Sequence, residues 1–84
     1  MDRGDHYLVF GLSTCPFCEE AVALLSFLGY NHDYYTLDDD PEYLQELKEF
    51  YQHKTVPIVV RIGGQDSKVR FIGGCDDLKR ELND

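Results

Sequence analysis

The sequence YLVFGLSTCPFC, residues 7–18, contains the transition that decides the fold. Its apolar start, Tyr7–Phe10, predicts a short buried strand. Thr14-Cys15-Pro16 then predicts a helix start, because proline suits the first helical position. The apolar residues that follow recur at helical spacing and predict a buried helix face, and Gly29 predicts the end of that helix. These apolar residues are Ala21, Leu24, Leu25 and Leu28.

The middle of the chain predicts a second strand and a second helix. Residues 32–37 are rich in Tyr and Thr, which favour strands. Asp38–Asp40 precede Pro41, and this acidic start suits the positive end of a helix dipole. The apolar face of this helix is expected to comprise Leu44, Leu47, Phe50 and Tyr51.

The last third of the chain predicts a hairpin and a short helix. Residues 57–62 and 68–72 read as strands, and the Gly-rich segment between them as a turn. A final helix begins near Cys75. The resulting order, β-α-β-α-β-β-α, predicts an α/β domain with a small four-stranded mixed sheet flanked by helices, and its first β-α-β unit predicts a parallel strand pair.

Composition narrows the class of protein. The chain has 84 residues, which predicts a single domain over residues 1–84. Its net charge of -8 argues against binding nucleic-acid phosphates or an anionic membrane surface. The first residues lack an apolar signal core, and no apolar run is long enough for a membrane span. We therefore expect a cytoplasmic protein.

The CPFC sequence at residues 15–18 is the strongest chemical signal. The nucleophile in disulfide exchange is the thiolate. A sulfur at a helix N-terminus faces unpaired N–H groups and the positive end of the dipole, which favour the thiolate of Cys15. Cys18 lies one turn further along, close enough to bridge. We therefore expect Cys15 to attack a disulfide and Cys18 to resolve the mixed disulfide that forms.

Two other interpretations of these cysteines are an inert buried pair and half of a zinc site. A four-cysteine zinc site needs a second pair, and only Cys75 remains. The histidines, His6, His32 and His53, show no ligand spacing. The sequence therefore favours redox chemistry and predicts no metal site.

Three motifs together resemble the glutaredoxin family. They are CPFC at residues 15–18, TVP at residues 55–57 and GGCDD at residues 73–77, in the family's order and spacing. The resemblance spans nearly the whole chain. It implies a thioredoxin-like fold, glutathione as co-substrate and electron donor, and no tightly bound cofactor.

The TVP motif implies one wall of a glutathione site. Pro57 resembles the family's cis-proline, which would present the backbone N–H and C=O of Val56 to a bound tripeptide, as an added strand would. From the residues alone, Pro57 could instead simply start a strand. Thr55 either contacts the ligand or only supports the turn.

The GGCDD motif implies the opposite wall. Gly74 lets a ligand approach the backbone, and the N–H groups of Cys75 and Asp76 would receive the γ-glutamyl carboxylate. The ligand's ammonium group would meet Asp76 or Asp77. Both acids could equally be plain helix caps. Cys75 is expected to contribute its backbone rather than its thiol to the site, the alternative being a third reactive thiol.

Two positions depart from the usual pattern. Phe17 stands where many relatives carry Tyr, so the ring can wall the cleft without the phenol's hydrogen bond. Leu12 stands where many glutaredoxins carry Lys, which is associated with the glycyl carboxylate and with the thiolate. Lys54, directly before the TVP motif, is our hypothesis for a substitute.

The resemblance implies a monomeric enzyme that reduces protein disulfides and protein–glutathione mixed disulfides. One alternative is a redoxin that takes electrons from thioredoxin reductase and delivers them to ribonucleotide reductase. Another is an iron–sulfur carrier that bridges a cluster between two chains through Cys15 and glutathione. Pro16 resembles the dithiol enzymes, which are less prone to carry clusters.

Overall fold

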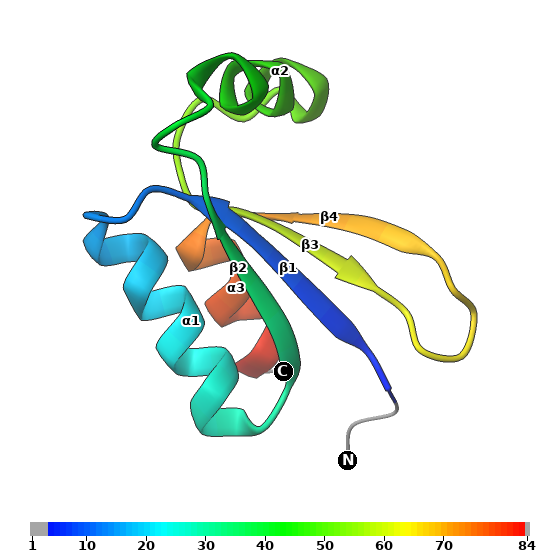
Figure 1. Cartoon of the computed structure of the whole chain (residues 1–84). Coiled ribbons are helices and arrows are strands. Elements are labelled where there is room, and N and C mark those ends of the chain that lie inside the picture. Colours follow the sequence, from blue (N-terminus) through cyan, green and yellow to red (C-terminus); the bar gives the residue numbers. More distant parts are fainter. Residues whose placement is uncertain (1–3, 84) are drawn as a thin grey trace.

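The computed structural model describes residues 4–83, which form a four-stranded sheet and three helices (Figure 1). The elements follow in the order β1 (His6–Gly11), α1 (Pro16–Leu28), β2 (Asn31–Thr36), α2 (Pro41–Tyr51), β3 (Ile58–Ile62), β4 (Val69–Gly73) and α3 (Cys75–Asn83). The strand order across the sheet is β2-β1-β3-β4. β1 is parallel to β2 and antiparallel to β3, and β4 is antiparallel to β3. The predicted order and the thioredoxin-like fold are confirmed.

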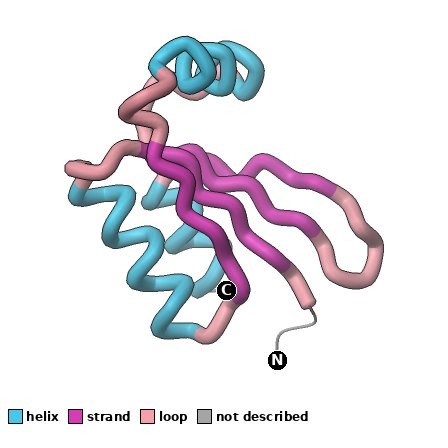
Figure 2. The backbone as a smooth tube through the Cα atoms, in the orientation of Figure 1, coloured by secondary structure: helices cyan, strands magenta, loops and turns pink. Residues whose placement is uncertain are grey.

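The helices lie on the two sides of this sheet. α1 and α3 lie along one face, and α2 lies on the opposite side (Figures 1 and 2). Side chains alternate along a strand, so β1 directs Tyr7 and Val9 toward α1 and α3, and Leu8 and Phe10 toward α2. None of the helices within residues 4–83 combines the length and hydropathy needed to cross a membrane.

The first core fixes α1 and α3 side by side. Leu25 of α1 and Leu78 of α3 are fully buried against Val9 and Val59 of the sheet. Burial of each such leucine contributes about 1.5–3 kcal/mol relative to an exposed position. α1 ends as predicted at Gly29, whose φ of 81° and ψ of 18° place it in the left-handed region. This packing brings the N-termini of the two helices to the same edge of the sheet, where the site lies.

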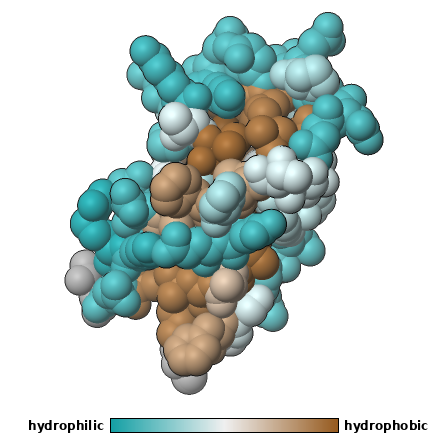
Figure 3. Space-filling view, turned by 90° about the vertical axis from the view of Figure 1, so that its left-hand side faces the viewer, coloured by the Kyte–Doolittle hydropathy of each residue, from teal (hydrophilic) through white to brown (hydrophobic). Residues whose placement is uncertain are grey.

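The second core lies under α2. Leu44 packs against Ile58 and Val60, with Leu47 and Tyr51 at its margin. Its border is open, because a hollow of about 400 Å³ is lined by Leu8, Phe10, Tyr35, Leu37 and Tyr43. Figure 3 shows apolar surface directly below α2, with hydrophilic residues around it.

Two predicted core residues are in fact exposed. Phe50 is 77% exposed, because the buried stripe of α2 runs through Leu44, Leu47 and Tyr51 and leaves Phe50 to one side. Leu28 is 43% exposed, because it is the last residue of α1 and only the turn at Gly29 follows it. The predicted apolar faces were therefore wrong at these positions.

Candidate active site

Cys15 is the N-cap of α1. Its backbone is extended, with φ -130° and ψ 106°, and Pro16 follows at the first helical position. The sulfur accepts a hydrogen bond from the backbone N–H of Cys18 at 3.2 Å. The residue is 8% exposed. The sulfur therefore lies among the free N–H groups that stabilise negative charge at a helix start.

Cys18 lies below Cys15 and is fully buried. Gly11 at the end of β1 makes room for it, since a Cβ on Gly11 would lie 2.4 Å from the Cys18 sulfur. Burial, and next a hydrogen bond with Cys15, raise the pKa of Cys18 to about 12. Both cysteines are free thiols in this structure. The outer thiol is thus placed to react first, and the inner one is held protonated.

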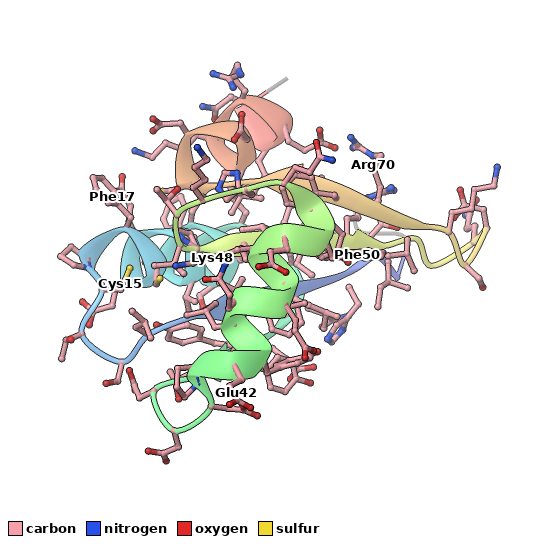
Figure 4. All side chains as sticks on the ribbon, turned by 90° about the horizontal axis from the view of Figure 1, so that it is seen from above. Cys15, Phe17, Glu42, Lys48, Phe50 and Arg70 are labelled. Carbon is pink, nitrogen blue, oxygen red and sulfur yellow. The ribbon has the colours of Figure 1, made fainter. Side chains whose placement is uncertain are left out.

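A cleft of about 330 Å³ lies beside the start of α1. It brings together all eight residues that the sequence assigned to glutathione binding, and it adds His53. Its lining residues are Phe17, His53, Thr55, Val56, Pro57, Gly74, Cys75, Asp76 and Asp77. Figure 4 shows Cys15 and Phe17 together at the N-terminal end of α1.

The TVP segment forms one wall of the cleft. The Val56–Pro57 peptide bond is cis, which confirms the expectation drawn from the resemblance. Pro57 is buried and lies just before β3. The Thr55 hydroxyl lies 3.4 Å from Nε2 of His53, so this residue lines the cleft and also contacts a neighbour within it.

The start of α3 forms the other wall, where the two acidic residues differ. Asp77 accepts a hydrogen bond from the Gly74 N–H at 2.9 Å through Oδ2, and one from Arg80 at 2.5 Å through Oδ1. Asp77 is therefore a helix cap with both oxygens engaged. Asp76 is exposed, and within residues 4–83 its carboxylate has no hydrogen bond or ion pair. Asp76 is thus the carboxylate available to a ligand.

The Cys75 thiol lies in the first core rather than in the open cleft. The residue is 6% exposed and packs with Leu78. Burial, and next the negative charge of Glu20, raise the pKa of this thiol. A protonated, buried thiol is a poor nucleophile. The cleft therefore meets Cys75 mainly through its backbone at the start of α3.

His53 also lines the cleft, a position that its sequence spacing did not predict. The chain reaches it after Gln52, the left-handed C-cap of α2, where the His53 N–H bonds to the Lys48 carbonyl at 2.9 Å. Its ring packs edge-on against Phe71, with centroids 5.6 Å apart. A Cβ on Gly74 would lie 3.3 Å from its Nε2. The feature of the sequence that could have indicated this role is its position two residues before the TVP motif.

The two positions considered for a missing lysine lie elsewhere. The Leu12 side chain packs at the margin of the second core. Lys54 is exposed and lines a separate hollow with residues of α2, among them Lys48 and Glu49. Among residues 4–83, His53 is the basic side chain that lines the cleft.

The sequence model of the glutaredoxin family matches residues 8–66. The chain is 39% identical over 74 residues to Glutaredoxin-1 of Rhizophagus irregularis, covering 84% of this chain and 67% of that protein. It is 31% identical over 70 residues to Glutaredoxin 3 of Escherichia coli, covering 83% and 77%.

Solved structures agree with this fold. A crystal structure of wheat glutaredoxin matches with a TM-score of 0.75 and 35% identity, covering 92% of this chain and 68% of that one. A buckwheat glutaredoxin–glutathione complex matches with a TM-score of 0.79 at 24% identity, covering 94% and 69%, which is a likeness of fold. Since the family model spans more than half of the chain, the chain belongs to the glutaredoxin family.

Proposed function

We propose that this glutaredoxin is a glutathione-dependent enzyme that reduces protein–glutathione mixed disulfides and protein disulfides through Cys15. Membership of the family makes it a thiol–disulfide oxidoreductase. The single observation that carries the finer proposal is the position of the cleft. It extends from Phe17, next to the cysteine pair, past the cis Val56–Pro57 bond to the start of α3.

The cleft offers a matching group for each part of glutathione. The backbone of Val56 is positioned to pair with the tripeptide as a neighbouring strand would. The first N–H groups of α3, at Cys75 and Asp76, suit the γ-glutamyl carboxylate. The Asp76 carboxylate suits the ammonium group, because both oxygens of Asp77 already have partners within the chain.

We assign the glycyl carboxylate to His53. This side chain lies in the cleft, whereas Leu12 and Lys54 point into other surroundings. An imidazole N–H can donate to a carboxylate whether the ring is neutral or charged. We therefore propose His53, rather than Lys54, as the group that binds this end of the ligand in place of the lysine of related enzymes.

Reduction of a glutathionylated protein uses Cys15 alone. The Cys15 thiolate attacks the glutathione sulfur of the mixed disulfide, and the protein thiolate leaves and takes up a proton. Cys15 is now joined to glutathione, and a second glutathione attacks the glutathione sulfur of this new disulfide. Oxidised glutathione leaves, and Cys15 returns as the thiolate.

Reduction of a protein disulfide also requires Cys18. Cys15 first forms a mixed disulfide with the substrate protein, and Cys18 then closes the Cys15–Cys18 bridge and releases the second protein thiol. Two glutathione molecules reopen the bridge. The three cysteines are free thiols here, and we place this chemistry in the reducing cytoplasm.

The direct test is glutathione-dependent reduction of a small glutathione mixed disulfide, coupled to glutathione reductase and NADPH. We expect turnover in the wild type, loss of turnover in Cys15→Ser and retained turnover in Cys18→Ser. A wild type that shows no turnover with glutathione, but is reduced by thioredoxin reductase, would refute the proposed electron donor.

A further inference from the structure

Tyr34 of β2 lies directly against the inner cysteine. Its hydroxyl donates a hydrogen bond to the carbonyl of Leu12, and a hydrogen bond with this hydroxyl also lowers the pKa of Cys18. Its ring approaches the same point as the Cys18 sulfur, since a Cβ on Gly11 would lie 3.5 Å from Tyr34 Cε1 and 2.4 Å from that sulfur. The Tyr34 ring and the Cys18 sulfur therefore face the same space at the end of β1, beside the Leu12 carbonyl to which the phenol donates.

The chemistry of Cys18 explains why such a neighbour matters. Its sulfur is fully buried, and water cannot stabilise negative charge on it. To close the bridge, that sulfur must nevertheless give up its proton and attack Cys15. The groups that face it are the Cys15 sulfur, the Leu12 backbone N–H and the Tyr34 hydroxyl, and the last two stabilise the thiolate. Tyr34 is the side-chain donor in this set.

We propose that Tyr34 is a catalytic residue of the bridge-closing step, in which its hydroxyl turns from the Leu12 carbonyl to donate a hydrogen bond to the developing Cys18 thiolate. This proposal deepens the proposed function and rests on its dithiol branch. The electron pair of Cys18 forms the new bond to Cys15, the bond from Cys15 to the substrate sulfur breaks, and the departing thiolate takes up the proton released by Cys18. No further oxidant or reductant is needed.

The neighbouring tyrosine provides a matched control. Tyr35 points to the other face of the sheet, where it stacks on Phe10 with ring centroids 5.5 Å apart, and it is 45% exposed. Loss of its hydroxyl removes the same atom from the same strand without touching the cysteines. Tyr34→Phe and Tyr35→Phe therefore make the same chemical change, but only Tyr34→Phe makes it beside Cys18.

The experiment follows both thiols in one trace and needs no glutathione. Reduced protein is mixed with 2,2′-dipyridyl disulfide, which releases one chromophoric thione when Cys15 attacks and a second when Cys18 displaces it. Cys18→Ser identifies the second phase by its loss. In Tyr34→Phe we expect the second phase to slow by about tenfold, the lower end of what a hydrogen bond to a charged group contributes. The first phase, and both phases of Tyr35→Phe, should keep wild-type rates.

Two outcomes would overturn the proposal. An unchanged second phase in Tyr34→Phe would show that the hydroxyl plays no part in closing the bridge. Equal slowing of both phases would show that Tyr34 only maintains the structure around Leu12. Circular dichroism of each reduced variant verifies that it is folded, so partial unfolding is not mistaken for slow closure. Because the reagent replaces glutathione, failure of the glutathione proposal would leave this result interpretable.

Discussion

Replacing Gly73 with alanine should destabilise the protein through a defined contact at the start of α3. Gly73 has a φ of 127°, a region that other residues enter at a cost of about 1–3 kcal/mol. A Cβ there would lie 2.3 Å from Oδ2 and 2.7 Å from Cγ of Asp77. The carboxylate must move, and the Gly74 N–H then loses the partner that it holds at 2.9 Å. Loss of a helix cap costs about 1 kcal/mol.

Together these terms predict that Gly73→Ala lowers the free energy of unfolding by about 2–4 kcal/mol. Domains of this kind have unfolding free energies of about 5–15 kcal/mol, so the variant should still fold. Urea denaturation under reducing conditions measures the loss. The apparent glutathione KM should rise as well, because the displaced residues form the wall of the cleft.

Gly29→Ala is the matched control. Gly29 also has a positive φ, 81°, but nothing lies within 4 Å of its Cβ position. Only the left-handed backbone penalty applies there, about 1–2 kcal/mol, and the glutathione KM should not change. If Gly73→Ala cost no more stability than Gly29→Ala and left KM unchanged, the argued contact between Gly73 and Asp77 would be refuted.

Three further predictions concern the cleft and the buried thiol. Asp76→Asn should raise the glutathione KM by about fivefold, the upper range for an exposed ion pair. Asp77→Asn should mainly lower the unfolding free energy. Steady-state kinetics measures the first effect and urea denaturation the second. His53→Ala should raise KM by about fivefold while Lys54→Ala leaves it unchanged, and the reverse pattern in the same assay would restore Lys54 to the site. Burial raises the pKa of Cys18 to about 12, so as pH rises the unfolded chain releases this proton before the folded protein does. The unfolding free energy should therefore fall as pH rises above about 8.5. Urea denaturation of reduced protein should show a steeper fall in the wild type than in Cys18→Ser.

The sequence sufficed for the elements whose signals are local. Pro16 and Gly29 mark the two ends of α1, and the continuous apolar run Tyr7–Phe10 marks β1, whose two faces both pack against helix layers. The cis bond before Pro57 could not be derived from the residues alone, because most X-Pro bonds are trans, and only the family resemblance implied it.

The remaining details depended on how elements meet in space. Phe50 satisfied a helical pattern, yet α2 touches the sheet along a narrower stripe than the pattern allowed. Lys54 is next to the TVP motif in sequence, but the left-handed cap at Gln52 sends His53 into the cleft instead. Tyr34 and Cys18 are far apart in sequence, and only the parallel pairing of β1 and β2 brings them together.

The reactive sulfur of Cys15 also caps α1, and oxidation of this sulfur weakens the cap. As N-cap of α1, Cys15 accepts the Cys18 N–H through the same atom that attacks disulfides. Each oxidation removes negative charge from that acceptor and so weakens the first turn of α1, and each reduction restores it. The free energy of forming this turn is therefore part of the redox equilibrium. Substitutions that stabilise the first turn of α1 only when Cys15 is a thiolate will shift the protein toward its reduced form, even where they never touch a substrate.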